Sequence, residues 1–286
     1  MSYQIITDSC CDFTDREYAA MNVTAVPLSV MWEGASHSHF SDEEALKNFY
    51  EQMRRGLVAT TSALNPDNWA GAMEPWLREG KDLLVLTVSS GISATYQSAV
   101  IAAEDLGERY PHRKIRVVDT LSGSLGEGLL VRHACNLRDA GESLEAVAAW
   151  VEAHRGCLCH WVTVDTLANL KRSGRLSSAS AMVGTMLNIK PIIRVTEEGK
   201  LVAAGVARGR KASIRALAKR FAEARREDSD IVAIAHGDCA EEAQLLKSIL
   251  REEYGVKNVL VGFVGPILGA HTGPGVLGLF HLGKQR

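Results

Sequence analysis

Short apolar runs alternate with helical patterns along the first half of this chain, and this alternation constrains the fold more than any other feature. Residues 82–88 are apolar almost throughout, which is typical of a strand buried on both faces of a sheet. Shorter runs predict three more strands, at residues 3–6, 23–28 and 115–118. Helical patterns separate the runs, at residues 41–55 with Ser41 as N-cap, 93–106, 126–139 and 143–154. The alternation predicts a mostly parallel sheet with helices on both faces.

The second half of the chain follows a different pattern. Residues 189–195 and 201–206 are apolar and flank Glu197-Glu198-Gly199, which indicates an antiparallel hairpin. Further patterns predict strands at residues 159–164, 231–235, 259–264 and 276–281, and helices at 211–226 and 240–254. With 286 residues the chain exceeds the usual size of a single core. We therefore expect a two-domain α/β protein, with a parallel α/β domain over residues 1–160 and a mixed-sheet α+β domain over residues 161–286.

Charge and hydropathy exclude several classes of function. The 32 basic and 34 acidic residues leave a net charge of −2, which argues against nucleic acid as the main partner. No apolar run approaches the ~20 residues that span a bilayer. The first residues lack the features of a secretory signal, so we expect a cytoplasmic location. The basic segment 208–220 is followed by acidic residues at 223, 227 and 228, which favours a solvated helix face. A regulatory or DNA-associated protein is the least supported class.

Motifs for metals and nucleotide cofactors are missing from the sequence. Cys157-Leu158-Cys159-His160 is half of a metal site, but a structural zinc needs four ligands and no second pair stands at a matching spacing. Free cysteines are commonly small core residues. The sequence has no phosphate-binding loop, no dinucleotide-binding glycine motif after the first strand, and no nucleophile elbow. We expect neither a metal nor a cofactor.

The segment 265–275 is the strongest candidate for a functional site. It contains four glycines and two prolines and follows the apolar run 259–264, which we interpret as a buried strand. Glycine lets backbone N–H groups approach a ligand closely, and His271 and Thr272 add two side-chain donors. The sequence predicts a loop that binds an anion, with a tight turn as the simpler alternative.

Three other segments carry polar side chains that suit an anion. Asp8-Ser9, Thr60-Thr61-Ser62 and the block 89–97 are each expected where a strand ends, and open parallel sheets bind ligands beyond the carboxyl ends of their strands. Ser93 stands at a helix start, where it serves as an N-cap, contacts an anion, or does both. The segment 170–177, with a helix expected from Ser177, places three cations around a Ser-Gly turn, either as an oxyanion clamp or as solvated charge.

The order and spacing of these blocks resemble the DegV family of bacterial fatty-acid-binding proteins. The resemblance is carried by residues 7–9, 61–62, 89–99, 170–177, 187–193 and 265–275. It implies a two-domain α/β fold that holds one long-chain fatty acid between the domains, with the tail buried. The carboxylate then lies against hydroxyls at Thr61, Ser62 and Ser93 and under the loop of His271 and Thr272. Gly91 and Asp8 are matched by motif, and for Asp8 a structural role is as open as direct contact.

The resemblance also implies a biochemical role. Family members act as acyl-carrying subunits of a fatty acid kinase, so this chain is expected to be non-catalytic alone and to present the carboxylate to a separate ATP-dependent kinase subunit. Arg175 and His271 match positions that support transfer of the phosphoryl group. The product is an acyl phosphate for phospholipid synthesis, and transient membrane contact is expected without a spanning segment. The alternative is a stand-alone acyl- or phosphoryl-transfer enzyme that uses Ser93 and His271.

This sequence departs from the family pattern at three places. Ala63-Leu64 replaces the usual Gln-Pro, Cys10-Cys11 stands where small or hydroxyl residues are common, and Ala94 stands where glycine is frequent. These departures leave the hydroxyls expected to bind the carboxylate in place but change the surroundings of the entrance. The acyl-chain preference therefore does not follow from the sequence.

Overall fold

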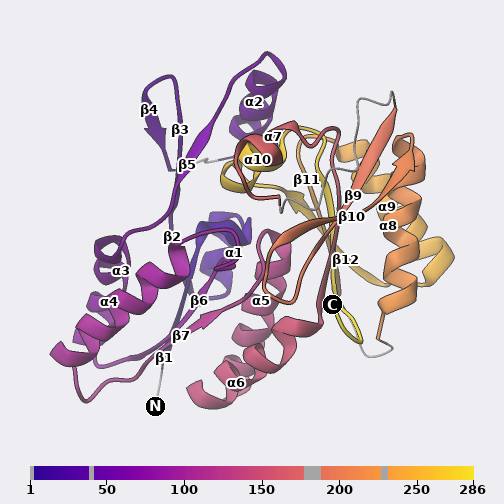
Figure 1. Cartoon of the computed structure of the whole chain (residues 1–286). Helices are drawn as coiled ribbons and strands as arrows, with labels where there is room; N and C mark the ends of the chain where they lie inside the picture. The colour runs from indigo at the N-terminus through magenta and orange to yellow at the C-terminus, as the bar shows by residue number, and fades with distance from the viewer. Residues whose placement is uncertain (1–2, 39–41, 177–187, 227–230) are drawn as a thin grey trace.

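The computed structural model describes residues 3–38, 42–176, 188–226 and 231–286. A four-stranded sheet in the first half has the strand order β2-β1-β6-β7, and every neighbouring pair is parallel (Figure 1). Its strands are β1 (Tyr3–Asp8), β2 (Val23–Val26), β6 (Asp82–Thr87) and β7 (Ile115–Asp119). Pro27 follows β2 at the sheet edge, where a missing N–H donor costs no ladder hydrogen bond. The predicted parallel sheet is confirmed.

Helices cover both faces of this sheet because successive residues of its central strands point to opposite sides. Ile6, Leu83 and Val85 pack with α3 (Pro66–Arg78) and α4 (Thr95–Arg109). Ile5, Leu84 and Leu86 pack with α5 (Leu125–Asp139) and α6 (Leu144–His154). The shorter helices are α1 (Asp15–Ala20) and the 3-10 turns η1 (Ser9–Cys11) and η2 (Arg155–Cys157).

The second half forms a six-stranded mixed sheet with the order β10-β9-β8-β13-β11-β12. Its strands are β8 (Leu158–Thr163), β9 (Ile189–Val195), β10 (Leu201–Arg208), β11 (Ile231–His236), β12 (Asn258–Phe263) and β13 (Leu277–Leu282). The pair β11–β12 is parallel and the other neighbouring pairs are antiparallel, so the predicted hairpin of β9 and β10 is confirmed. Helices α8 (Arg210–Ala224) and α9 (Ala240–Tyr254) pack on one face.

Helix α5 lies between the two large sheets and joins their cores (Figure 1). Leu129 and Leu130 belong to one apolar cluster with Ile5 of β1, Ala233 of β11 and Phe280 of β13. The first seven residues of α5 are all buried, so this part of the helix is covered on several sides. The two sheets therefore share apolar packing through α5, and the domain boundary after residue 160 stays a prediction.

A third, small sheet changes the position of one predicted site segment. Strand β5 (Thr60–Ser62) pairs antiparallel with β3 (Ser29–Trp32), which pairs in turn with β4 (Ala35–His37). The expectation that residues 60–62 lie at the carboxyl end of a parallel strand was wrong, because a three-residue strand carries too little pattern to show its partner. Helix α2 (Glu43–Arg54) is capped by Asp42, whose carboxylate accepts from the Ala45 N–H at 2.9 Å. Ser41, the expected cap, lies outside the described residues.

Two further expectations about the elements around the site need correction. Residues 265–275 are largely helical, as α10 (Pro266–Thr272), because Pro suits the first position of a helix. Strand β12 is not buried: it forms a sheet edge and none of its residues is fully covered. Strand β13 matches the strand expected at residues 276–281 and lies in the centre of its sheet, between β8 and β11. The helix expected from Ser177 lies outside the described residues.

The described residues contain neither a membrane-spanning helix nor a cluster of metal-binding side chains. In these parts of the chain, no helix combines the length and the apolar character needed to cross a membrane. The same residues hold no group of three or more His, Cys, Asp and Glu side chains placed to bind a metal ion.

Candidate functional site

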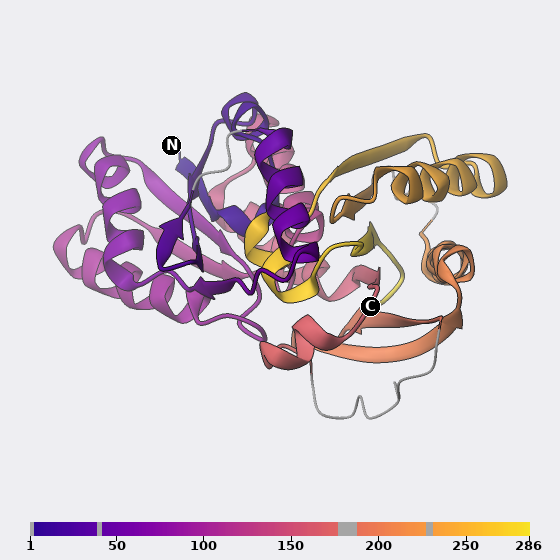
Figure 2. The ribbon, with the colours of Figure 1, turned by 90° about the horizontal axis from the view of Figure 1, so that it is seen from above.

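Helix α10 lies where the two halves of the chain meet, next to α2 (Figure 2). It packs against β3, β5 and η1 of the first half and against α7 (Ala168–Arg172) of the second. The close fit requires a glycine, since a Cβ atom on Gly269 would lie 2.5 Å from the hydroxyl of the fully buried Tyr50. That hydroxyl donates to the Val264 carbonyl at 2.6 Å, just before α10 begins. The contact fixes where the helix starts.

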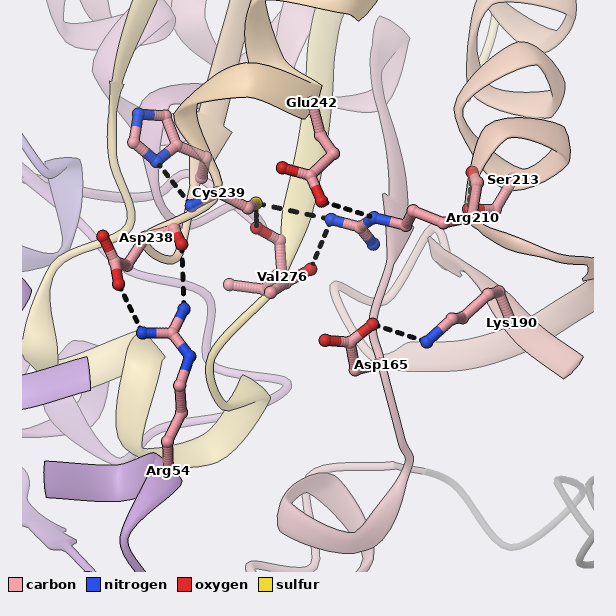
Figure 3. A network of polar contacts seen from close by, with 11 residues as sticks. Arg54, Asp165, Lys190, Arg210, Ser213, Asp238, Cys239, Glu242 and Val276 are labelled. Atoms are coloured by element: carbon pink, nitrogen blue, oxygen red, sulfur yellow. Dashed lines mark hydrogen bonds and ion pairs between the residues drawn. The ribbon is translucent and has the colours of Figure 1, made fainter. Parts of the chain in front are cut away.

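The end of α10 is held by the second half of the chain. Gly273 and Gly275 have φ angles of 82° and 76°, which favour glycine, and side chains there would clash with Asn169 and Asp165. The Gly275 carbonyl accepts from Arg210 Nη2 at 2.7 Å, and Arg210 also pairs with Glu242 at 3.7 Å (Figure 3).

The same network continues on either side of Arg210 (Figure 3). Lys190 Nζ donates to Asp165 at 2.6 Å, and Arg54 of α2 donates to the Asp238 carbonyl at 2.9 Å. Charged side chains from both halves of the chain therefore lie around the segment that follows His271.

His271 contacts a hydroxyl far away in the sequence. Its Nε2 lies 2.8 Å from Thr61 Oγ1 on β5. Burial lowers the pKa of His271 to about 4, and the positive charges of Arg175 and Arg172 act in the same direction. The imidazole is therefore neutral at pH 7, with one nitrogen as donor and the other as acceptor.

A cavity of about 150 Å³, here called the polar cavity, opens beside this pair. Ser93, Arg175 and Thr272 line it together with Thr61 and His271. The Ser93 hydroxyl lies 2.8 Å from Thr95 Oγ1 and accepts from the N–H of Thr95, the first residue of α4, at 3.2 Å. The cap position itself is Ala94, so the predicted N-cap role of Ser93 is off by one residue.

Arg175 reaches the polar cavity from the turn after α7. Its Nη1 donates to the Ser173 carbonyl at 2.6 Å, and its Nε donates to the Ile92 carbonyl at 3.4 Å. Gly174 makes this turn possible with a φ angle of 69°. The guanidinium is thus tethered to both halves of the chain beside the neutral imidazole.

A second cavity of about 80 Å³, here called the apolar cavity, adjoins the first. The two share the lining residues Ile92, Leu170, Leu201, Leu268 and Thr272. The apolar cavity extends between the loop after β7 and the inner face of the mixed sheet, where it is lined by Val162, Ile193, Val195, Val276 and Phe280. The pair of cavities suits a molecule with a polar head and an apolar tail.

Comparison with known proteins identifies the family. Residues 2–284 match the model of the DegV family, which is described as uncharacterised protein. The chain belongs to the DegV family. A DegV domain-containing protein of Clostridium perfringens is 37% identical over 289 positions, which cover 99% of this chain and 98% of that protein.

Solved DegV structures share the fold. A DegV lipid-binding protein from Thermotoga maritima matches with a TM-score of 0.88 and 28% identity over 100% of both chains. A DegV family protein from Thermus thermophilus, described for its fatty acid binding, matches with a TM-score of 0.88 and 32% identity, over 99% of this chain and 100% of that one. The two-domain α/β fold class expected from the sequence is confirmed.

Three predicted site residues of this DegV chain, Ser62, Gly91 and Asp8, do not line either cavity. Ser62 is exposed on β5, with its hydroxyl 3.4 Å from the Ala63 carbonyl. Gly91 faces the β9–β10 turn, where a Cβ atom would clash with the carbonyls of Glu198 and Gly199. Their roles as ligand-binding residues stay predictions.

Asp8 is fully buried and holds two backbone segments together. Its carboxylate accepts from the Cys10 N–H at 2.9 Å and from the Val88 N–H at 2.7 Å, which ties the end of β1 to the end of β6. Burial raises the pKa of Asp8 to about 6, against the effect of these hydrogen bonds. The sequence left a structural role and direct ligand contact open for Asp8. The observed contacts of Asp8 in this DegV chain are structural.

Sequence reasoning missed Ser122 and His160, which line the apolar cavity and contact each other. In the sequence, His160 stands out only as part of half a metal motif. The alternation of side chains along β8 places His160 and Val162 on the same face, which was a usable signal. Nothing comparable marked Ser122, because it lies on a loop.

Proposed function

We propose that this chain binds one long-chain fatty acid, with the hydrocarbon tail in the apolar cavity and the carboxylate in the polar cavity. Thr61 and Ser93 supply neutral hydroxyls for the carboxylate, and His271 and Thr272 cover it from α10. The single observation that carries the proposal is the junction of a polar cavity with an apolar one. The fatty acid binding described for the Thermus thermophilus relative agrees with it.

The energetics favour the tail as the main source of affinity. Burial of each methylene group contributes about 0.8 kcal/mol, so a chain of about 16 carbons supplies ample affinity by itself. The head group then needs only to be positioned, for which hydroxyls suffice. A carboxylate held by neutral groups also keeps more of its nucleophilic character than one held in a tight arginine fork.

We propose that the bound carboxylate reacts at the active site of a partner protein. We infer that a separate ATP-dependent kinase subunit phosphorylates it to an acyl phosphate that enters phospholipid synthesis, and that Arg175 and His271 support this transfer. Arg175 brings a positive charge to the place where negative charge develops on the acyl phosphate. The absence of a nucleotide-binding motif from the sequence supports a kinase site on another chain.

The alternative of a stand-alone transferase finds less support in the geometry. A nucleophile and its base are expected within hydrogen-bonding reach of each other. His271 contacts Thr61, whereas Ser93 contacts Thr95, so the two residues of that alternative are not paired.

Native mass spectrometry of the purified protein tests the binding proposal. We expect one fatty acid per chain, and we expect delipidated protein to take up palmitate or oleate in titration. Protein that is isolated without lipid and that binds neither acid would overturn the proposal.

A further inference from the structure

The apolar cavity contains one polar pair that the proposed carboxylate site does not use. Ser122 lies on the loop after β7 and His160 on β8; both line the cavity, and Ser122 Oγ lies 2.6 Å from His160 Nε2. Their exposed fractions are 1% and 3%. A saturated hydrocarbon tail has no hydrogen bond to offer such a pair, and buried polar atoms cost free energy unless they are hydrogen-bonded. The hydrogen bond between Ser122 and His160 uses only part of the bonding capacity of the serine hydroxyl, and a plain tail leaves the rest unused.

The other hydroxyls of this cavity hold the protein together. Ser89 donates to the Gly199 carbonyl at 2.9 Å and accepts from the Gly91 N–H at 3.0 Å. Ser124 donates to the Asp12 carboxylate at 2.5 Å. Within the described residues, the Ser122 hydroxyl bonds only to His160, another residue of the cavity wall. The Ser122 hydroxyl thus differs from those of Ser89 and Ser124, because it bonds to a side chain of the cavity wall and holds no other segment in place.

The protonation state of His160 leaves the Ser122 oxygen able to accept one more hydrogen bond. Burial holds the pKa of His160 well below its usual range, and Arg286 adds to this effect while the Leu158 carbonyl opposes it. In the neutral ring, Nε2 either accepts from Ser122 or donates to it. In the first case Ser122 Oγ keeps two lone pairs, and in the second it keeps one lone pair and its own proton. Both tautomers leave an acceptor on Ser122.

We propose that Ser122 and His160 form a second polar subsite, which takes a hydroxyl group carried on the hydrocarbon chain of the ligand. The inference rests on the proposed function, because it requires an acyl chain in the apolar cavity. The ligand class is then a hydroxylated long-chain fatty acid whose chain hydroxyl donates to Ser122 Oγ. Plain fatty acids still bind, since the pair satisfies its own hydrogen bond when no hydroxyl is offered.

Competition binding with stearate and a series of hydroxystearates tests this subsite. The hydroxyl group is moved from the middle of the chain to its end, and each acid displaces a fluorescent fatty acid from the delipidated protein. A hydroxyl without a partner in an apolar site weakens binding by about tenfold or more. We expect one hydroxyl position to escape this loss, and we expect Ser122→Ala to lose that advantage, measured as the ratio of hydroxystearate to stearate affinity within the same variant.

Two variants control for shape and folding. Val162→Ala changes the volume of the same cavity without touching a polar atom, so the ratio of hydroxystearate to stearate affinity is expected to stay as in the wild type. Ser122→Thr keeps the hydroxyl and is expected to keep the positional preference. If the wild type binds stearate but every hydroxystearate is weakened equally in wild type and Ser122→Ala, the subsite does not exist and the proposed function stands. If stearate itself does not bind, the proposed function fails and the subsite fails with it.

Discussion

At the scale of single residues, the contact between Thr61 and His271 determines the chemistry of the polar cavity. The two side chains are 210 positions apart in sequence and 2.8 Å apart in space. A neutral imidazole and a hydroxyl next to a tethered guanidinium can orient a carboxylate without neutralising it. The charge state of His271 and the hydroxyl of Thr61 are therefore the features to measure first.

Removal of the Thr61 hydroxyl should weaken fatty acid binding. Thr61→Val keeps the shape of the side chain, and the loss of a hydrogen bond to a charged group corresponds to about 1.5–3 kcal/mol, or at least about tenfold in Kd. Isothermal titration with oleate measures the change. Thr60→Val is the matched control, because Thr60 is the exposed neighbour on β5. Equal affinities for the two variants would exclude a role for the Thr61 hydroxyl.

The titration of His271 should show the effect of its cationic neighbours. In ligand-free protein, NMR of the imidazole protons should give a pKa of about 4, below the usual 6.5, because burial, Arg175 and Arg172 all disfavour the imidazolium. Arg175→Gln should raise this pKa, whereas Lys171→Gln should not, since Lys171 is not among the causes of the shift. A wild-type midpoint near 6.5 would contradict the environment described for His271.

The same shift has a consequence for stability. The folded-state pKa of His271 is depressed, so between about pH 4 and pH 6.5 the unfolded chain binds more protons at this residue than the native chain does. The His271 contribution therefore makes the protein less stable as the pH falls through this window. Asp8 acts in the opposite direction, because its raised pKa lets the native state bind more protons between about pH 4 and pH 6.

At the scale of elements, α10 connects the halves of the site, and its glycines make this connection possible. Gly269→Ala places a methyl group against the hydroxyl of the buried Tyr50, so we expect a loss of about 1–3 kcal/mol in the free energy of unfolding. Gly107→Ala in α4 meets no atom within 4 Å and should stabilise the protein by about 0.5–1 kcal/mol. Urea unfolding of both variants measures the difference, and equal stabilities would refute the tight packing of α10.

Hydrophobic periodicity predicted most elements, because it reflects directly which residues are buried. Helices α4 and α5, strand β6 and the β9–β10 hairpin were all expected to within a few residues. Sheet order was harder to predict. The apolar run of β12 is that of a covered strand, yet the run says nothing about which strand lies at the edge. The glycine and proline content of segment 265–275 predicts a loop, although Pro266 and Gly273 stand at the two ends of a helix.

The candidate site depended on contacts that no local pattern contains. The resemblance to known motifs brought Thr61, Ser93 and His271 together, and the fold places them around one cavity. The resemblance did not separate Ser62 from Thr61. Neighbouring residues of a strand face opposite sides, so Ser62 points away from the cavity that Thr61 lines. The resemblance also gave no reason to connect Ser122 with His160, because the connection requires the loop after β7 to meet β8 across the space between two sheets.

At the scale of the whole molecule, the two cavities lie where elements of both halves meet, so a bound ligand should stabilise the complete fold. Ligand that binds only the native state adds RT ln(1 + [L]/Kd), or about 2.7 kcal/mol at a concentration of 100 Kd. Saturating palmitate should therefore raise the Tm of delipidated protein and slow hydrogen exchange in both α10 and the β9–β10 hairpin, which belong to different parts of the site.

Hexanoate separates the contribution of the tail from that of the head group. It carries the same carboxylate but about ten fewer methylene groups, so at about 0.8 kcal/mol each it loses most of the binding free energy. At equal concentration it should leave the Tm unchanged. A rise in Tm equal to that with palmitate would mean that the carboxylate alone drives binding, and the apolar cavity would then have no part in holding the ligand.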